Sequence, residues 1–420
     1  MTVAFDSNVN LTVEVGFDSE PFDSSQSFTD ISAYVRGINI SRGRSNELGQ
    51  FTAGSCELLL SNADNRFNPT QTTHYYDSAN ARTKIQPLKT VKITATYDSS
   101  NYVIYYGFLD QIPVTYPAMG ADSVVRFTAI DAFKIFQAQT IQSVGWKIGQ
   151  VGFSELGTST RLGYADAVEL TSLRLTRLLD SIGFPSALRD INTGTLNIQQ
   201  QALTTNLLTA MRDCETAENA QFFISADGKA TFRNRNYKLS NTKAIDVQAT
   251  FDNSGSNLPY KDVITSFDTD EVKNVYEWTR SGGAAQYVAD ADSVSRYTAK
   301  TSTQTTMNTT NANVLSIIQQ KLSETALPIE RIDRLVVNPR DNVGLWPKIL
   351  GMEFGDRVKV NITNPNGTTF SDEVWIQSIK HNISSGSQSW TYTISLSPAG
   401  SSGWVLGQAK IGEGTRFAYT

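Results

Sequence analysis

Two blocks of β-forming residues, one near each end of the chain, repeat the same pattern of three strands. The blocks comprise residues 90–96, 103–111 and 124–132, and residues 357–363, 374–381 and 390–398. Val91 and Phe127 are 36 positions apart, as are Val358 and Ile394, and each middle strand carries an apolar residue, Leu109 or Ile379. Such alternating, β-branched runs predict half-buried strands. We expect two related β-barrels with all six residues facing inward, since closed barrels leave no exposed strand edge.

The chain as a whole is predicted to be mainly β with α+β insertions. Residues 11–15, 31–40 and 56–60 predict further strands ahead of the first block. The expected organisation is an N-terminal β-barrel domain at 1–140, a small α/β domain at 141–240, a mixed α+β domain at 241–345, second-barrel strands at 346–400 together with parts of 241–345, and a C-terminal tail at 401–420.

Helical spacing is found in the middle of the chain. A first helix is expected to end before Gly183 and Pro185, and a second to cover 203–216. Their apolar faces are Leu170, Leu173, Leu178 and Ile182 in the first, and Leu207, Met211 and Cys214 in the second. Asp227-Gly228 between two β-rich runs predicts a hairpin.

The following region mixes strands, loops and one helix. Residues 312–326 predict a helix with Leu315, Ile318 and Leu322 on one face. The run 300–311 is almost entirely Thr, Ser, Asn and Gln, which is too polar to fill a core. It predicts an exposed loop.

Composition excludes several classes of function. The 420-residue chain can bury a large core without a disulfide or metal. Its net charge is −5 and it has no dense Lys/Arg cluster, which argues against specific nucleic-acid binding. Residues 1–6 lack the basic and apolar regions of a signal peptide, and no stretch approaches the ~18 apolar residues of a membrane span.

Cysteine and histidine are too sparse to indicate a metal or catalytic centre. Cys56 and Cys214 lie in apolar patterns and are expected to be free, buried thiols in different domains. His74 and His381 have no His or Cys partner at ligand spacing, and no Gly-x-Ser-x-Gly motif occurs. We interpret both histidines as surface or core residues without an enzymatic role.

Acidic pairs and oxygen-rich turns are the other candidates for chemistry. Paired carboxylates could serve a glycosidase, but Glu353/Asp356 and Asp268/Asp270/Glu271 lie in turn-like or exposed settings among 41 acidic residues. Residues 62–68 lack the glycine and closing glutamate of an EF-hand, so a turn with Asx hydrogen bonds is expected. The aromatic loop residues Phe22, Tyr75 and Tyr76 are possible contact residues. We therefore predict no catalytic, cofactor-binding or metal-binding residues, and no enzyme.

A family resemblance is carried by several segments that follow one another along nearly the whole chain. Ser41-Arg42-Gly43-Arg44 stands within the first of them, and Trp346-Pro347 within one of the last. The segments are 38–51, 53–54, 60–69, 106–110, 128–133, 178–185, 189–194, 223–229, 231–233, 345–358 and 396–399. Together they resemble the large minor tail protein of long-tailed bacteriophages, the family that forms the tail-tip, or baseplate, hub.

The resemblance implies a homotrimeric hub similar to those of contractile-tail baseplates and type VI secretion spikes. Three chains with two barrels each would form a pseudo-six-fold collar that continues the hexameric tail tube. The implied partners are the distal tail protein or tail-tube ring, the tape-measure protein, and tail fibres or receptor-binding proteins. The expected location is the virion tail tip, after synthesis in the host cytoplasm. The family has no catalytic residues or cofactor to carry over, and lytic or fibre-bearing extensions are not expected after 404–406.

Two other functions stay open at this point. The chain could be a glycan-binding module of the tail tip that presents loops 62–80 and 300–311 to the host surface, or a peptidoglycan hydrolase. A hub would let DNA pass through its lumen without specific binding, so its lining should be poor in Lys and Arg. The acidity of the chain could equally serve solubility alone.

Overall fold

The computed structural model describes residues 3–6, 9–23, 25–116, 122–140, 168–200, 206–386 and 388–399. The expected tail at 401–420 and the expected domain start at 141 lie outside these residues. Most of the described chain shares one apolar core, and a smaller second core surrounds Tyr276 and Trp278. Among the described residues, no helix is long and apolar enough to cross a membrane.

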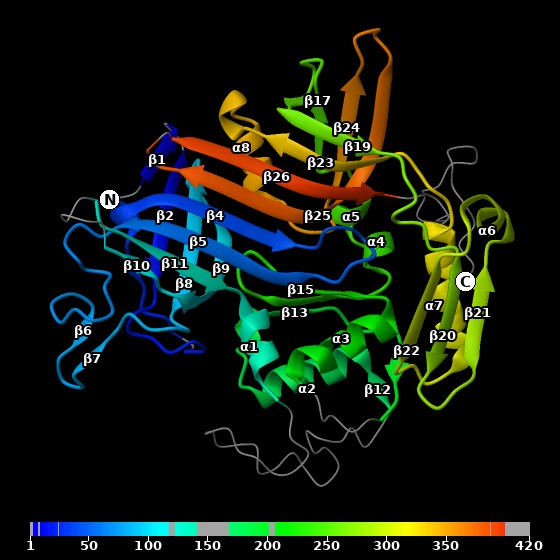
Figure 1. The fold of residues 1–420 in the computed structure, drawn as a ribbon, viewed down its shortest axis with the longest axis horizontal. Coiled ribbons are helices and arrows are strands. Elements are labelled where there is room, and N and C mark those ends of the chain that lie inside the picture. Colours follow the sequence, from blue (N-terminus) through cyan, green and yellow to red (C-terminus); the bar gives the residue numbers. More distant parts are fainter. Residues whose placement is uncertain are drawn as a thin grey trace.

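One 16-stranded sheet forms the body of the protein (Figure 1). Its main path runs β1-β2-β8-β9-β11-β5-β4-β25-β24-β17-β18, and five more strands pair off this path. Its N-terminal strands are β1 (Val3–Asp6), β2 (Val9–Val15), β3 (Thr29–Asp30), β4 (Val35–Gly43), β5 (Thr52–Ser61), β8 (Thr90–Tyr97), β9 (Ser100–Gln111), β10 (Val114–Thr115) and β11 (Val124–Ile130). Its C-terminal strands are β17 (Ala249–Asp252), β18 (Leu258–Pro259), β19 (Asp262–Ser266), β23 (Arg331–Val337), β24 (Arg357–Thr363), β25 (Thr369–Ser384) and β26 (Ser389–Pro398).

The 16-residue strand β25 joins the two halves of this sheet. On one side its first half pairs with β24 and its second half with β4, while its other side pairs with β26. Residues 374–379 of β25 are buried without alternation, because both faces are covered at the crossing. Gly43 ends β4 opposite Ser378, and a Cβ there would lie 2.4 Å from the Gln377 carbonyl oxygen. The contact between the two strands therefore requires glycine at this position.

The two predicted blocks share a strand order. Both are antiparallel meanders, β8-β9-β11 and β24-β25-β26, and the six residues expected to face inward are all buried. Their registers differ, however, since Ile379 is opposite Ile394 whereas Leu109 is opposite Ala129. The repeat therefore extends to strand order and burial but not to residue-by-residue pairing.

The two expected barrels are not found. No sheet closes within the described residues, and the main path ends at β1 and β18 without pairing them. The pairing of β4 with β25 explains the difference, because β4 lies along the part of β25 that β24 does not cover and so joins the two halves into one open sheet. Sequence periodicity predicts strands but carries no information on which edges meet.

A small α/β unit packs against the N-terminal strands. Its elements are α1 (Ala132–Ala138), β12 (Glu169–Leu170), α2 (Thr171–Ser181), η4 (Ser186–Leu188), β13 (Arg189–Ile191), β14 (Asn197–Ile198), α3 (Leu207–Glu218), β15 (Gln221–Ile224) and β16 (Ala230–Arg233). The hairpin predicted at Asp227-Gly228 is confirmed by the antiparallel pairing of β15 with β16. The predicted apolar face of α2 is partly wrong, because Leu173 is 56% exposed and Leu175 and Leu179 are buried instead.

A second unit has its own three-stranded sheet, β20 (Val275–Arg280), β21 (Ala285–Ala289) and β22 (Thr301–Thr306), with helices α6 (Ala291–Tyr297) and α7 (Asn311–Thr325). The helix predicted at 312–326 is confirmed as α7, whose buried residues are Val314, Ile317 and Ile318. The exposed loop predicted at 300–311 is wrong over 301–306, which forms β22 parallel to β20. β22 is an edge strand with mostly exposed side chains, and its threonines favour strands, so its polarity did not exclude one.

Short elements complete the described chain: η1 (Ser32–Tyr34), β6 (Tyr76–Asp77), β7 (Arg82–Thr83), α4 (Tyr237–Ser240), α5 (Thr242–Ile245), η5 (Pro339–Asp341) and α8 (Leu345–Gly351).

Candidate functional site

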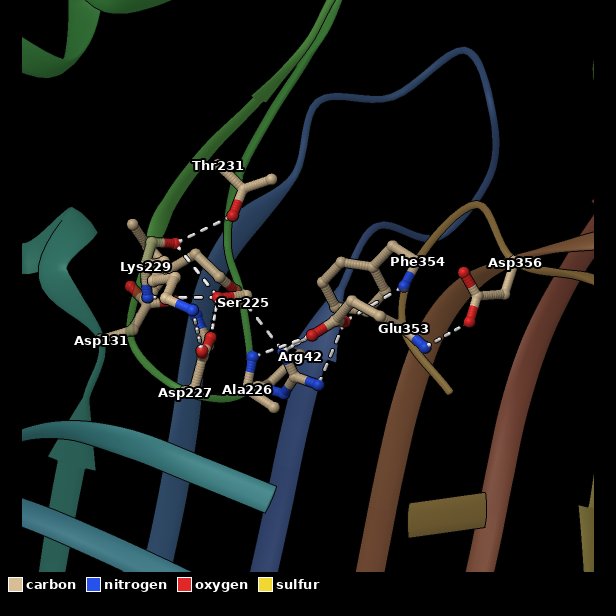
Figure 2. A network of polar contacts seen from close by, with 12 residues as sticks. Arg42, Asp131, Ser225, Ala226, Asp227, Lys229, Thr231, Glu353, Phe354 and Asp356 are labelled. Atoms are coloured by element: carbon tan, nitrogen blue, oxygen red, sulfur yellow. Dashed lines mark hydrogen bonds and ion pairs between the residues drawn. The ribbon is translucent and has the colours of Figure 1, made fainter. Parts of the chain in front are cut away.

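A buried ion pair between Arg42 and Glu353 lies where three parts of the chain meet (Figure 2). Arg42 is on β4, Glu353 precedes β24, and the turn between β15 and β16 lies between them. Both guanidinium terminal nitrogens donate to the carboxylate at 3.2 Å, one to each oxygen. The Ala226 amide of the turn donates to the same carboxylate at 2.8 Å. One carboxylate therefore connects β4, the hairpin turn and the segment leading into β24. We call this contact of Arg42, Ala226 and Glu353 the junction.

The surroundings of this pair exclude water from most of it. The side chains of Arg42 and Glu353 are 4% and 16% exposed, and the Arg42 guanidinium lies 4.9 Å from the centre of the Phe354 ring. A buried pair of this kind offsets its desolvation cost only through good geometry and additional hydrogen bonds. The bidentate contact and the Ala226 amide provide both. The arrangement holds β4, the hairpin turn and the segment before β24 in fixed positions relative to one another.

The hairpin turn is itself held from two sides. Lys229 and Asp227 form an ion pair at 2.7 Å, and the Asp227 carboxylate accepts from Ser225. Gly228 has φ +83°, and a Cβ there would lie 2.3 Å from the Tyr106 ring of β9. The sequence signal Asp-Gly thus predicts the turn correctly, while its contact with β9 appears only in the fold.

A second set of contacts crosses the seam between β4 and β25. Arg44 is buried, and its Nε donates to the Gln377 side chain at 2.6 Å. The Gln377 amide in turn donates to Ser397 on β26, also at 2.6 Å. The sequence pattern predicts a strand over 31–40, whereas β4 extends to Gly43 and both Arg42 and Arg44 are buried. The signal that was missed is the pair of arginines flanking a glycine directly after an apolar strand.

Two buried carboxyl groups near the junction have raised pKa values. Burial raises the pKa of Asp131 to about 7, although its carboxylate accepts from the amides of Gly54 and Phe133. Burial likewise raises the pKa of Asp356 to about 6. Asp131 caps α1 and ties it to β5, and Asp356 accepts from the Glu353 amide at 3.1 Å. Each carboxyl group thus has a structural hydrogen-bonding role.

The acidic pairs considered for hydrolysis have protein partners. Glu353 pairs with Arg42, and one oxygen of Asp356 accepts from the Glu353 amide while its other oxygen is buried without a hydrogen-bond partner. In the second cluster, Arg331 donates to Asp268 and to Asp333, both at 2.8 Å, and lies 3.9 Å from Glu271. Glycoside hydrolysis uses two carboxylates that flank one bond of the substrate, and in each group an arginine binds at least one carboxylate.

The two histidines occupy opposite environments. His74 is exposed, whereas His381 on β25 is buried against the rings of Trp390 and Tyr392. The Trp390 indole N–H donates to His381 Nδ1 at 3.1 Å. Burial lowers the pKa of His381 to about 3, and the charge of Arg42 acts in the same direction. A neutral His381 is therefore part of the seam between β4 and β25.

The other candidates are structural too. Cys56 and Cys214 are free and buried, as predicted. The predicted turn with Asx hydrogen bonds is confirmed, since the Asp64 side chain accepts from the Arg66 amide at 3.3 Å and the Asn62 side chain from the Phe67 amide at 2.9 Å. Phe22 and Tyr75 pack on neighbouring aromatic rings, which corrects their interpretation as loop contacts. Within the described parts of the chain, no group of three His, Cys, Asp or Glu could hold a metal ion.

A shallow cleft of about 380 Å³ lies beside α3, lined by Gln50, Thr52, Ala53, Phe133, Gln137, Asn206, Leu208, Thr209 and Arg212. Its charged residue, Arg212, donates to the Gln50 side chain and the Phe51 carbonyl, both at 2.7 Å. The cleft therefore offers no pair of acid and base groups for catalysis.

Comparison with known proteins finds solved structures of similar fold. No protein-family model and no curated protein sequence matches the chain. The tail protein from Neisseria meningitidis MC58 matches 93% of this chain over 97% of its own length, with 10% identity and a TM-score of 0.56. The 43 kDa tail protein of prophage MuSo2 from Shewanella oneidensis matches 93% of this chain over 98% of its own, with 10% identity and a TM-score of 0.53. At such low identity, the likeness shows a shared fold.

The junction yields a first prediction. Replacing Arg42 by Met leaves Glu353 buried without its cation, and Glu353→Gln leaves Arg42 without its anion. Each change should lower the free energy of unfolding by about 3–5 kcal/mol. Denaturant titration measures it, with Arg126→Ala as control because the Arg126–Glu57 pair is exposed and its loss should cost about 1 kcal/mol or less. Equal effects at both sites would contradict the role of the junction.

The buried histidine yields a second prediction. His381→Ala removes packing and the acceptor of the Trp390 N–H, and should cost about 2–4 kcal/mol at pH 7, against about 0.5 kcal/mol or less for exposed His74→Ala. The pKa of His381 is about 3 in the folded chain and ordinarily 6.5. The unfolded chain therefore binds the proton first as the pH falls.

The stabilising contribution of neutral His381 is present above pH 6.5 and is lost between pH 6.5 and 3, by up to about 1.4 kcal/mol per pH unit. Unfolding of the wild type and His381→Phe across this range tests the sign. A stability difference that stays constant with pH would contradict it.

Proposed function

We propose that this chain is a structural component of a bacteriophage tail tip. Three copies would form a ring that adapts the hexameric tail tube to the tip and gates the lumen for DNA ejection. The observation that carries the proposal is a fold similar over 93% of the chain to two tail proteins. A role in assembly also fits a polar network whose groups hold strands in place instead of facing a substrate.

The internal repeat supports the trimeric ring. Each chain contains two meanders with the same strand order, so three chains supply six similar units to a six-fold tube. Such matching requires a fixed relation between the two meanders within a chain. The pairing of β4 with β25 and the Arg42–Glu353 pair supply that fixed relation.

The proposed partners follow from this position. The tail-tube ring or distal tail protein would stack on one side, the tape-measure protein would end at the lumen, and fibres or receptor-binding proteins would attach outside. DNA would pass without specific binding. No membrane partner is proposed.

The alternatives have less support. A glycan reader gathers aromatic side chains in one concave patch. The most exposed aromatic residues described here, Tyr116, Phe267 and Tyr287, lie after β10, after β19 and on β21. A hydrolase would need free carboxylates, and Glu353 and Asp268 of the acidic groups described above are bound by arginines.

Deletion of the gene from the phage that encodes it tests the proposal, with the chain supplied from a plasmid as control. Loss of an adaptor should prevent tail completion, and electron microscopy should show no finished tails. Complete tails that no longer adsorb would indicate a receptor-binding module instead. Complete tails that adsorb but fail to penetrate the wall would indicate a hydrolase.

A further inference from the structure

Two arginines of helix α2 share one carboxylate oxygen. Arg174 and Arg177 both donate to Oε1 of Glu169, Arg174 through Nε at 2.6 Å and Arg177 through Nη2. The side chains of Arg174, Arg177 and Glu169 are 1%, 14% and 17% exposed. Within the described chain, the ion pairs of both arginines go to Glu169. Two largely buried cations are therefore held by a single carboxylate.

Arg177 also has hydrogen-bond donors without an acceptor. Its Nε and Nη1 are both buried and have no hydrogen-bond partner. Two further described arginines, Arg42 and Arg357, have one such nitrogen each, but each of them pairs with a carboxylate of its own, Glu353 and Glu373. A buried charged group with unused donors is costly, so native proteins usually place a bound ion or water at such a position.

The arginine pair lies where β12, α2 and α3 meet (Figure 1). Burial raises the pKa of Cys214 on α3 to about 12, and the charges of Arg174, Glu169 and Arg177 also act on this thiol. The thiol is therefore neutral at pH 7 and supplies no negative charge to the arginines. Asp213, next to it on α3, has a contact of its own.

An anion suits this group better than water does. Water would satisfy the unused N–H groups of Arg177 but would add no negative charge to offset the repulsion between two adjacent guanidinium groups. Arginine binds phosphate through charge-assisted hydrogen bonds from its planar array of donors. A phosphate ion offers four oxygens, so one ion can accept from Arg177 and still face the positive charge of Arg174.

We propose that Arg177 and Arg174 form a binding site for inorganic phosphate at the contact of β12, α2 and α3. The unused N–H groups of Arg177 donate to the phosphate oxygens, and Arg174 supplies the second positive charge. Glu169 holds the two guanidinium groups together and leaves the donors of Arg177 available. This inference does not depend on a role in a phage tail. Its consequence is that phosphate stabilises the small α/β unit.

Calorimetric titration of the full chain with inorganic phosphate, at constant ionic strength in sodium chloride, tests the proposal. One phosphate should bind per chain. Arg177→Gln should weaken this binding at least about ten-fold, because it removes a charged donor group. The control Arg189→Gln removes an ion pair with Asp180 in the same unit and should leave phosphate binding unchanged. Absence of binding, or equal binding by the wild type and Arg177→Gln, would overturn the proposal.

A variant with increased affinity guards against a folding defect of Arg177→Gln. Glu169→Gln removes the negative charge beside the site and releases donors of both arginines. Phosphate should therefore bind to it at least about three-fold more tightly than to the wild type. Loss of binding through damage to the fold would act in the opposite direction. Unchanged or weaker phosphate binding by Glu169→Gln would overturn the proposal.

Discussion

The pairing of β4 with β25 is the contact on which the rest of the structure depends. It merges strands from residues 35–43 and 369–384 into one sheet, and it places Arg42 opposite Ile379, beside the segment that carries Glu353. This pairing brings together the bidentate ion pair, the Arg44–Gln377 contact and the His381–Trp390 contact, because Gln377 and His381 both lie on β25. The buried charges then make the pairing selective, because a register shift would leave them without partners in a nonpolar environment.

Sequence reasoning succeeded where local patterns determine local structure. The Asp227-Gly228 hairpin, the helix at 311–325 and the strand order of both meanders follow from turn chemistry and periodicity. Sequence patterns did not predict which distant segments pair with each other. Closed barrels were expected, but β4 pairs with β25 instead. Period-two alternation predicts strands and does not determine which strands pair. For the same reason, the buried ion pair could not be predicted, since Arg42 pairs with a glutamate about three hundred residues away in the sequence.

The buried polar groups have the contacts expected of a structural protein, which is the proposed role. An enzyme concentrates unpartnered, strained or solvated polar groups in a cleft, whereas Glu353 and Asp268 here are engaged by arginines, and Asp131 by backbone amides. A ring component needs rigid units at fixed spacing. The fixed relation between the two meanders meets this need.

A cryo-electron microscopy reconstruction of the assembled tail tip tests the central claim most directly. The account predicts three copies of this chain around the tail axis, with their two meanders alternating to give a pseudo-six-fold ring next to the tail tube. A two-fold or six-fold arrangement of the chain, or its location away from the tube axis, would contradict the account.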